Sequence, residues 1–400
     1  MARFLMEPIT VNNAKTNNLK NINVKIYYNE LTVCVGVSGS GKTSFAFDAL
    51  VNGIDCSVIN KPKECYSISQ RISDTKLKIN KVLETINKIK KPSLLVIDEP
   101  LAGTTNDEAV HISKLLCDLA HQNNAVVIVE HRLEIIEKAD KVIVFGPESG
   151  ANGGEIINIT TGKDYLKNLK MPELNHKINN SKKELWAEFK EFNGIKNFIV
   201  SIKVNQITAV TGDMNSSKVD YINAIFSAYD KSVRANKDRK SLISVKNKTL
   251  IRRPHIIDAT PVSKNGRSTV ATYYKLSQFI KKEQTDITIK EAMGVFKDNN
   301  RIIRRLEYLQ NIGLDYLKLN QPSYTLSGGE CQRIKLAKLL CKKLGDRSIY
   351  IFDNPVRGLG MNNIVKIMNS FNSLVKKNNT VLIAENDPLA LRCVDTIIQV

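Results

Sequence analysis

The chain has 400 residues, of which 42% are hydrophobic, and this length allows two or three domains with cores of their own. Its formal charge of +19 indicates either a polyanionic partner or a lysine-rich surface that faces solvent, and charge alone does not separate the two. No apolar run reaches the roughly 18 residues of a membrane-spanning helix, and the N-terminus lacks the apolar core of a secretory signal. We therefore expect a soluble, cytoplasmic protein. The seven cysteines are scattered without a C-x-x-C pair, so neither a zinc site nor a disulfide framework is expected.

Residues 36–43, Gly-Val-Ser-Gly-Ser-Gly-Lys-Thr, match the phosphate-binding pattern G-x-x-x-x-G-K-[ST]. A strand-like run, 31–35, precedes them and a helix-like run, 44–50, follows, which distinguishes a P-loop from a chance Gly/Ser turn. In a P-loop, backbone N–H groups cradle phosphates, the lysine reaches the β- and γ-phosphates, and the last hydroxyl ligates Mg²⁺. The expected nucleotide-binding residues are Gly36, Ser38, Gly39, Ser40, Gly41, Lys42, Thr43 and Ser44, with Thr43 also a metal ligand.

Two further apolar runs end in polar residues. The run 94–97 leads into Asp98 and Glu99, as a buried parallel strand does when it delivers carboxylates to the ligand-binding edge of a sheet. We expect Asp98 to hold Mg²⁺ through water and Glu99 to orient or deprotonate the attacking water. The run 125–129 leads to His131; such a histidine is often structural, but beside these motifs we expect it to contact the γ-phosphate. The other expected elements are helices over 77–89 and near 110–120 and a strand over 139–144.

Residues 18–44 and 194–220 are ungapped copies of one pattern, in which Lys218 corresponds to Lys42. A repeat around a P-loop predicts tandem nucleotide-binding domains. The expected boundaries are a first domain over 1–162, a lysine-rich and partly helical connector over 163–193, and a second domain over 194–400.

The second copy has lost the groups that hydrolysis needs. Its loop has two glycines fewer, and asparagine, which cannot act as a general base, replaces both the second acid and the histidine. We expect no tight Mg-ATP binding there. The replacements are Val219 for Thr43, Asn354 for Glu99 and Asn386 for His131.

The second half alone carries the sequence Leu-Ser-Gly-Gly-Glu, at 326–330. Two glycines behind a serine at a helix start let the hydroxyl and the backbone N–H groups close on a γ-phosphate bound by the opposite domain. The corresponding place in the first half, near 73–76, lacks both glycines. The expected binding residues of this signature are Ser327, Gly328, Gly329 and Glu330.

Together these motifs resemble ATP-binding cassette (ABC) proteins, and in detail the UvrA family, the damage-recognition subunits of bacterial nucleotide excision repair. The resemblance implies an α/β fold in which two tandem ABC-type P-loop domains form an intramolecular pseudo-dimer, with a helical signature subdomain in the second half. It also makes Gln70 a Q-loop residue, catalytic and metal-binding, whereas Ala259 occupies the second Q-loop position. The stretches that carry it are 18–22, 36–47, 146–147, 153–155, 258–273 and 328–333.

The resemblance implies one complete composite ATP site, which pairs the motifs of the first half with the signature of the second, and one dead site. ATP and Mg²⁺ are the implied cofactors. The family's zinc-binding cysteine pairs and the insertions expected between Lys42 and Asp98 are missing, so no zinc is expected.

Three functions remain open at this stage. The first is an ATPase that gates binding of duplex DNA, in repair or protection. The second is an ATP-driven accessory protein, in antibiotic self-resistance or biosynthesis, that acts on a cargo other than DNA. The third is the soluble ATPase of a transporter. Further homodimerisation is left open, and an unidentified protein partner is expected, without a membrane. The candidate phosphate contacts are Lys231, Arg234, Lys237, Arg239, Lys240, Lys246, Lys248, Arg252, Arg253, Arg301, Arg304 and Arg305.

Overall fold

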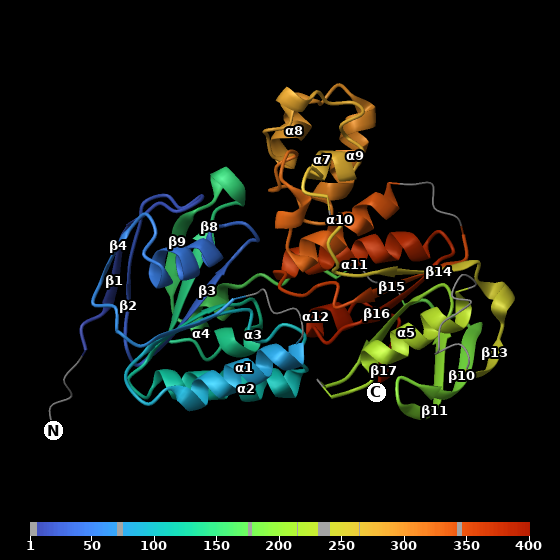
Figure 1. Cartoon of the computed structure of the whole chain (residues 1–400), viewed down its shortest axis with the longest axis horizontal. Helices are drawn as coiled ribbons and strands as arrows, with labels where there is room; N and C mark the ends of the chain where they lie inside the picture. The colour runs from blue at the N-terminus through green and yellow to red at the C-terminus, as the bar shows by residue number, and fades with distance from the viewer. Residues whose placement is uncertain are drawn as a thin grey trace. The chain divides into compact units, whose positions relative to one another are not determined.

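The computed structural model describes residues 6–69, 75–174, 178–213, 215–230, 241–263, 265–341 and 346–400 (Figure 1). The chain divides into two compact units. Unit 1 comprises Met1–Met171 and Gly358–Gly360, and unit 2 comprises Pro172–Arg357 and Met361–Val400.

Unit 1 is built on a six-stranded sheet with the strand order β5-β6-β7-β3-β8-β9. Neighbouring strands are parallel except β8 and β9, which are antiparallel. The central strands are unbroken apolar runs because they are buried on both faces. The strands are β3 (Glu30–Gly36), β5 (Cys65–Ile68), β6 (Leu94–Asp98), β7 (Ala125–Val129), β8 (Lys141–Gly146) and β9 (Glu155–Thr160).

A smaller antiparallel sheet and several helices complete unit 1. The small sheet has the order β2-β1-β4, and its buried side chains share one core with the P-loop helix η1. Its strands are β1 (Ile9–Ala14), β2 (Ile22–Ile26) and β4 (Ser57–Ile59). The helices are η1 (Ser44–Val51), α1 (Thr75–Lys88), α2 (Asn106–Ala120), α3 (Leu133–Ile136), η2 (Gly150–Asn152) and α4 (Gly162–Asn168).

Unit 2 contains a five-stranded parallel sheet in the order β14-β15-β16-β12-β17 and an antiparallel sheet in the order β11-β10-β13. The antiparallel strands are β10 (Glu184–Phe192), β11 (Ile195–Lys203) and β13 (Leu242–Lys246). The parallel strands are β12 (Ile207–Thr211), β14 (Arg253–Ile257), β15 (Ser348–Asp353), β16 (Thr380–Ala384) and β17 (Thr396–Gln399). The helices α5 (Lys218–Tyr229) and α11 (Met361–Val375) pack against these sheets, and unit 2 also contains η3 (Lys248–Leu250) and α12 (Pro388–Leu391).

The two units repeat one topology. The order β5-β6-β7-β3-β8 in unit 1 corresponds, strand for strand, to β14-β15-β16-β12-β17 in unit 2, and β2-β1-β4 corresponds to β11-β10-β13. In each unit the P-loop follows a central parallel strand, and the strand two places along ends in an aspartate, Asp98 or Asp353. This arrangement confirms the prediction of an α/β protein with tandem P-loop domains.

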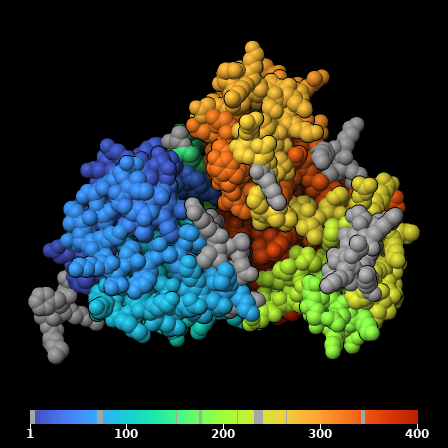
Figure 2. Space-filling view, in the orientation of Figure 1, coloured from blue at the N-terminus to red at the C-terminus, as the bar shows by residue number. Residues whose placement is uncertain are grey.

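A helical cluster projects from the rest of unit 2 and is orange in Figures 1 and 2. It packs through buried apolar residues such as Ile289, Leu306 and Ile334, and α10 carries the signature sequence at its first turn. The helical signature subdomain predicted for the second half is therefore present. Its helices are α7 (Val270–Tyr273), η4 (Lys282–Gln284), α8 (Ile289–Val295), α9 (Asn300–Gln310), η5 (Ser323–Thr325) and α10 (Gly328–Leu340).

The range expected as a connector, 163–193, contains more structure than its composition suggested. It includes most of α4 and the whole of β10, which pairs with both β11 and β13. Alternate residues of β10, among them Leu185, Ala187 and Phe189, are fully buried, as in a strand with one face on a core. The alternation of buried and exposed residues is short and lies among lysines, so the sequence did not reveal this strand.

All seven cysteines are free thiols. Among the described residues, no group of three or more histidine, cysteine or acidic side chains is placed to hold a metal ion. None of the helices in the described ranges combines the length and the apolar character needed to cross a membrane.

Candidate nucleotide site

The first P-loop is held tightly by its own unit. An added Cβ at Gly36, whose φ is +142°, would lie 2.2 Å from the carbonyl oxygen of Phe145, so this position requires glycine. The Asn18 side-chain amide donates to the carbonyl oxygens of Gly39, at 3.0 Å, and Gly150, at 2.9 Å. The loop therefore has a fixed shape before any phosphate reaches it.

Gly154 completes this support. Its N–H donates to the carbonyl oxygen of Ser40 at 3.0 Å, and an added Cβ would clash with the backbone of Asn18. The stretches around Asn18 and Gly154 carried part of the resemblance without an assigned role. The structure places both directly against the P-loop.

Lys42 and Ser40 present the polar groups of the loop. The Lys42 ammonium donates to the carbonyl oxygens of Gly36, at 2.9 Å, and Val37, at 2.8 Å. Burial lowers the pKa of Lys42 to about 8, against the opposing charges of Asp98 and Glu99. The Ser40 hydroxyl is buried and has no hydrogen-bond partner within the described part of the chain. A phosphate oxygen would satisfy this hydroxyl and give the lysine an anionic partner.

Asp98 is the last residue of β6 and Glu99 follows it, at the edge of the sheet where the P-loop lies. The Thr43 hydroxyl donates to the Asp98 carboxylate at 3.3 Å, so two oxygen ligands of the kind that Mg²⁺ prefers are adjacent. Burial, and next the charge of Glu99, raise the pKa of Asp98 to about 7, while Lys78 and Lys42 lower it. These residues fit a magnesium ion that keeps several of its waters.

Glu99 has a left-handed backbone, with φ of 50°. Such a conformation is costly for a residue other than glycine or asparagine, and here it is maintained by a 2.8 Å bond from the Glu99 N–H to the carbonyl oxygen of Val129. The left-handed conformation of Glu99 turns the chain sharply at the end of β6. It therefore fixes the direction in which the backbone leaves the sheet edge.

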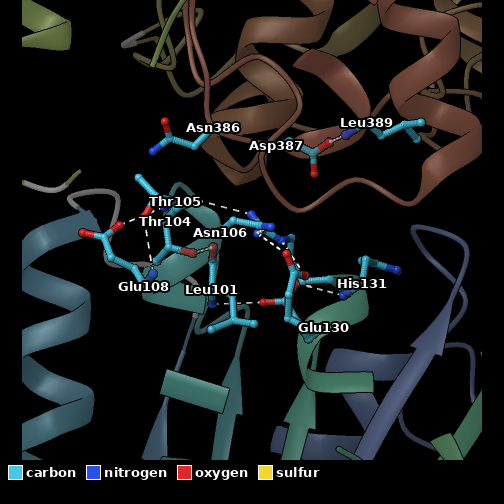
Figure 3. Close-up of polar contacts among 12 residues, drawn as sticks. Leu101, Thr104, Thr105, Asn106, Glu108, Glu130, His131, Asn386, Asp387 and Leu389 are labelled. Carbon is cyan, nitrogen blue, oxygen red and sulfur yellow. Dashed lines mark hydrogen bonds and ion pairs between the residues drawn. The ribbon is translucent and has the colours of Figure 1, made fainter. Parts of the chain in front are cut away.

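Glu130 is a buried acid that the sequence reasoning passed over. Its carboxylate accepts the N–H of Leu101 at 3.0 Å and the N–H of His131 at 2.8 Å, as Figure 3 shows. It thereby joins the loop after β6 to the loop after β7. We call this arrangement the carboxylate brace. Burial, with the charge of Glu99, raises the pKa of Glu130, although the two backbone bonds oppose the shift.

His131 lies directly after the brace. Burial, with the charge of Lys42, lowers the pKa of His131 to about 3. The imidazole is therefore neutral at physiological pH and offers one donor and one acceptor. Such a group can contact a phosphate or a water without adding charge.

The remaining predicted residue of this set, Gln70, lies outside the described residues, as do Ser73 and Asp74.

The second P-loop is closed by a side chain of unit 2. The Asn386 amide oxygen accepts the Thr211 hydroxyl at 2.7 Å and the Gly212 N–H at 3.1 Å, and its NH₂ donates to the Gly212 carbonyl at 2.8 Å. We call these three bonds the Asn386 clamp. Lys218 donates to the same carbonyl at 3.3 Å. Asn386 therefore binds the start of its own P-loop.

The rest of the unit 2 site repeats the backbone geometry of the unit 1 site, with asparagines in place of Glu99 and His131. Asn354 has φ of 46° and donates its N–H to the Ala384 carbonyl at 2.8 Å, as Glu99 does in unit 1. The Glu385 carboxylate accepts the N–H groups of Val356, at 3.2 Å, and Asn386, at 2.9 Å, which repeats the carboxylate brace. Burial raises the pKa of Glu385 to about 7.

The signature sequence forms the N-terminus of α10. The Ser327 hydroxyl accepts the Glu330 N–H at 3.3 Å, and the Glu330 carboxylate accepts the Ser327 N–H at 2.8 Å, which is a capping box. The Tyr316 hydroxyl also donates to Glu330. Glu330 therefore positions this helix start within unit 2. Gly328 and Gly329 add no side chain there, which leaves the backbone of the first turn unshielded by Cβ atoms.

The predicted basic residues are only partly placed. Residues 231–240, with five of the candidates, lie outside the described part of the chain. Lys246 stacks on the Trp186 ring at 4.4 Å, and Arg305 donates to the Tyr274 carbonyl and packs on Phe279. Arg252 forms an ion pair with Asp346 at 3.4 Å, so three of the described candidates have structural contacts. The exposed candidates are Lys246, Lys248, Arg252, Arg253, Arg301 and Arg304.

The fold and these motifs define a protein with two nucleotide-binding domains of the ATP-binding cassette type. A family model described as "ABC transporter" matches residues 195–357, within unit 2. The crystal structure of UvrA2 from Deinococcus radiodurans matches with a TM-score of 0.69 and 23% identity, over 82% of this chain and 50% of that one. A structure titled as a model of ribosome-bound archaeal Pelota and ABCE1 matches with a TM-score of 0.62 and 16% identity, over 100% of this chain and 77% of that one. At these identities the structural matches show a common fold.

Sequence comparison specifies the kind of ABC protein. UvrABC system protein A of Aquifex aeolicus is 28% identical over 394 residues, which cover 76% of this chain and 42% of that protein. The same protein of Micrococcus luteus is 27% identical, with 76% and 40% covered. The chain is therefore similar in sequence to UvrABC system protein A, as the motifs indicated. It spans about two fifths of the length of these relatives.

Proposed function

We propose that this chain is a Mg²⁺-dependent ATPase that hydrolyses ATP at the first P-loop and not at the second. The contrast between His131 and Asn386 carries the proposal. Unit 1 presents a neutral histidine, an acid pair and a P-loop with an unbonded buried hydroxyl. In unit 2 the corresponding asparagine is bonded to its own P-loop through the clamp.

The residues of unit 1 have separate roles in this proposal. Ser40, Lys42 and the loop N–H groups bind the phosphates, while Thr43 and Asp98 hold the metal. A bound Mg²⁺ would neutralise charge on the phosphate oxygens. Glu99 accepts a proton from the attacking water or orients it, and neutral His131 contributes a hydrogen bond. Gln70 remains a proposed catalytic and metal-binding residue on the basis of the resemblance alone.

We further propose a composite site in which the first turn of α10 completes the phosphate-binding groups of unit 1. The unshielded N–H groups at Gly328 and Gly329, together with the positive end of the α10 helix dipole, support an anion-binding role for this turn. The Ser327 hydroxyl caps the helix and can still donate to a phosphate. The chain would then act as a pseudo-dimer with one working site and one structural site.

Duplex DNA is the proposed partner, in repair or protection of DNA. The UvrA-like sequence and the net charge of +19 support it. Exposed cations of unit 2 such as Arg252, Arg253 and Arg304 suit contacts to phosphates that carry no sequence information. Cytoplasmic localisation, a further homodimer and an unidentified protein partner belong to the same proposal.

Steady-state ATP hydrolysis by matched variants tests the ATPase site. We expect Glu99→Gln to lower kcat by about 10²–10⁴-fold, because a general base contributes an effect of that size. Lys42→Ala should abolish turnover and Lys218→Ala, its matched control in unit 2, should retain it. Ser327→Arg should also abolish turnover if the site is composite. A Lys218→Ala enzyme as inactive as Lys42→Ala would show that the assignment to the first P-loop is wrong.

The DNA partner is tested separately, by fluorescence anisotropy with a labelled duplex and by ATPase rates with and without DNA. We expect affinity to fall steeply between about 50 and 200 mM salt, because binding releases counterions. The double variant Arg252→Ala/Arg253→Ala should weaken binding equally for duplexes of unrelated sequence. An ATPase that neither binds nor responds to DNA would instead indicate another cargo.

A further inference from the structure

The helix α10, which begins with the signature sequence, is bonded to the parallel sheet of unit 2 through a buried glutamine. Gln332 is 3% exposed, and its NH₂ group donates to the carbonyl oxygens of Ile257, at 2.9 Å, and Asp353, at 3.0 Å. These two acceptors are the last residues of the neighbouring parallel strands β14 and β15. One side chain of α10 therefore holds the ends of two strands.

A lysine one turn further along α10 holds the residues that follow β14. The Lys335 ammonium donates to the carboxylate of Asp258, at 2.6 Å, and to its carbonyl, at 3.1 Å. It also lies 2.8 Å from the carbonyl of Thr260 and 2.9 Å from the hydroxyl of that residue. An ammonium group has three N–H donors, so these four oxygens can occupy all of them. We call residues 258–260 the support loop.

The support loop lies directly against the signature sequence. A Cβ added at Gly328 would be 3.2 Å from the Cβ of Ala259, which is closer than an ordinary van der Waals contact. Ala259 is the middle residue of the support loop and occupies the second Q-loop position, where the glutamine is missing. The first turn of α10 is thus in contact with a loop that the same helix holds in place.

The position of this first turn matters for its proposed chemistry. N–H groups at a helix start stabilise a phosphate most when they already point at it, because no rearrangement is then needed during the reaction. A displacement of about 1 Å can cost roughly 10²-fold in rate, even when its cause lies away from the reacting atoms. The capping box fixes the local shape of the turn, whereas Gln332 and Lys335 fix the helix on the sheet.

We propose that Gln332 and Lys335 are positioning residues for ATP hydrolysis at the first P-loop, which hold the signature turn through the support loop and the ends of β14 and β15. The inference rests on the proposed composite site. Neither side chain contacts the nucleotide in this scheme. The support loop, which has lost its Q-loop glutamine, has a role in placing the signature turn.

Kinetics and nucleotide binding by matched variants test the proposal. The variants are Gln332→Met and Lys335→Met, which keep a long side chain and remove its N–H donors. The control is Gln310→Met, at the end of α9 in the same helical cluster. We expect both variants to lower kcat by roughly 10–100-fold, as a displaced group does, and the control to match wild type.

The affinities for two nucleotides separate positioning from a general loss of stability. With Mg²⁺ present, the affinity for β,γ-imido-ATP should fall by about tenfold or more in both variants, because a hydrogen bond to a charged group contributes that much. The affinity for ADP should stay at the wild-type value, because ADP has no γ-phosphate for the signature turn to contact. If wild type hydrolyses no ATP, these affinities decide alone.

A folded Gln332→Met or Lys335→Met protein that matches Gln310→Met in kcat and in both affinities would overturn the proposal. An equal loss of affinity for both nucleotides would also overturn it, since that result indicates a general effect on folding. If Gln332→Met does not fold, Lys335→Met decides, because the Lys335 side chain is 19% exposed and its loss is better tolerated.

Ser327→Arg in the same assays separates this inference from the composite site. Normal turnover by Ser327→Arg would overturn the composite site and this inference together. An inactive Ser327→Arg protein beside fully active Gln332→Met and Lys335→Met proteins would overturn this inference alone.

Discussion

The Asn386 clamp can be removed by a single substitution, Asn386→Ala. In unit 1 the corresponding residue, His131, has a backbone bond to Glu130, whereas the Asn386 side chain makes three bonds to the start of its own P-loop. Asn386 is 3% exposed, so water cannot easily replace its amide. If the clamp stabilises unit 2, the substitution lowers the stability of that unit specifically.

The structure sets the size of the effect. The alanine variant leaves the buried Gly212 N–H without an acceptor, which costs about 1–3 kcal/mol. The Gly212 carbonyl retains Lys218, and the Thr211 hydroxyl can rotate, so their losses are smaller. We expect a total of about 3 kcal/mol. With a urea m-value of about 3 kcal/mol/M for a unit of this size, the unfolding midpoint moves down by about 1 M.

Trp186 allows the measurement to be made on unit 2 alone. It is the only tryptophan of the chain and lies on β10, between the β11 and β13 neighbours of that strand. Its fluorescence in urea therefore reports unit 2 even if the units unfold separately. The matched control is Asn369→Ala, an exposed asparagine on α11, which should change stability by less than about 0.5 kcal/mol. Equal midpoints for Asn386→Ala and Asn369→Ala would refute the reasoning.

Two other predictions concern the acids of unit 1. The pKa of Asp98 is raised from 3.8 to about 7, so between those values the folded chain holds a proton that the unfolded chain has released. The free energy of unfolding should fall as pH rises through that range, by at most about 1.4 kcal/mol per pH unit. Urea unfolding in EDTA at pH 5 and pH 7 checks this, and the decrease in stability between the two pH values should be smaller for Asp98→Asn than for wild type. Glu99→Asn should raise the free energy of unfolding by about 0.5–1 kcal/mol, because asparagine tolerates the left-handed backbone, and it should lose ATP turnover. Calorimetry and an ATPase assay on the same protein measure these two effects. A variant less stable than wild type would contradict the argument from backbone strain.

The sequence was sufficient for the parts of the fold that follow strong local patterns. The unbroken apolar runs at 94–97 and 125–129 are buried parallel strands. The ungapped repeat around Lys42 and Lys218 predicted tandem nucleotide-binding domains, and the parallel strands of the two units follow the same order. These signals are local in the chain, or are repeated within it. The strand β10 was missed because its buried alternation is short and lies in a lysine-rich stretch.

The site was predictable where a motif specifies chemistry and not where a contact depends on folding. The adjacency of Thr43 and Asp98 follows from the pattern of the P-loop and the acidic strand. The burial of Lys78, which is 1% exposed on α1, was not predicted, because a lysine in an amphipathic helix is usually exposed. Asn386 was interpreted only as a lost histidine, since its bonds to Gly212 join residues 174 positions apart.

The carboxylate brace distinguishes residues that the fold requires from residues that hydrolysis requires. Glu130 and Glu385 make the same pair of backbone bonds in the two units, although the residue after each is histidine in one and asparagine in the other. A site that had merely decayed would have no reason to keep a buried acid whose pKa is raised by burial, because an unsupported acid there is costly. The brace holds together the loops after two neighbouring strands, so unit 2 needs it for its shape. Unit 2 thus has the geometry of a nucleotide-binding domain, and the Asn386 clamp occupies the start of the loop that a nucleotide would otherwise order. On this argument, the substitution of His131 by asparagine should abolish turnover in unit 1 without loosening the loops that Glu130 joins.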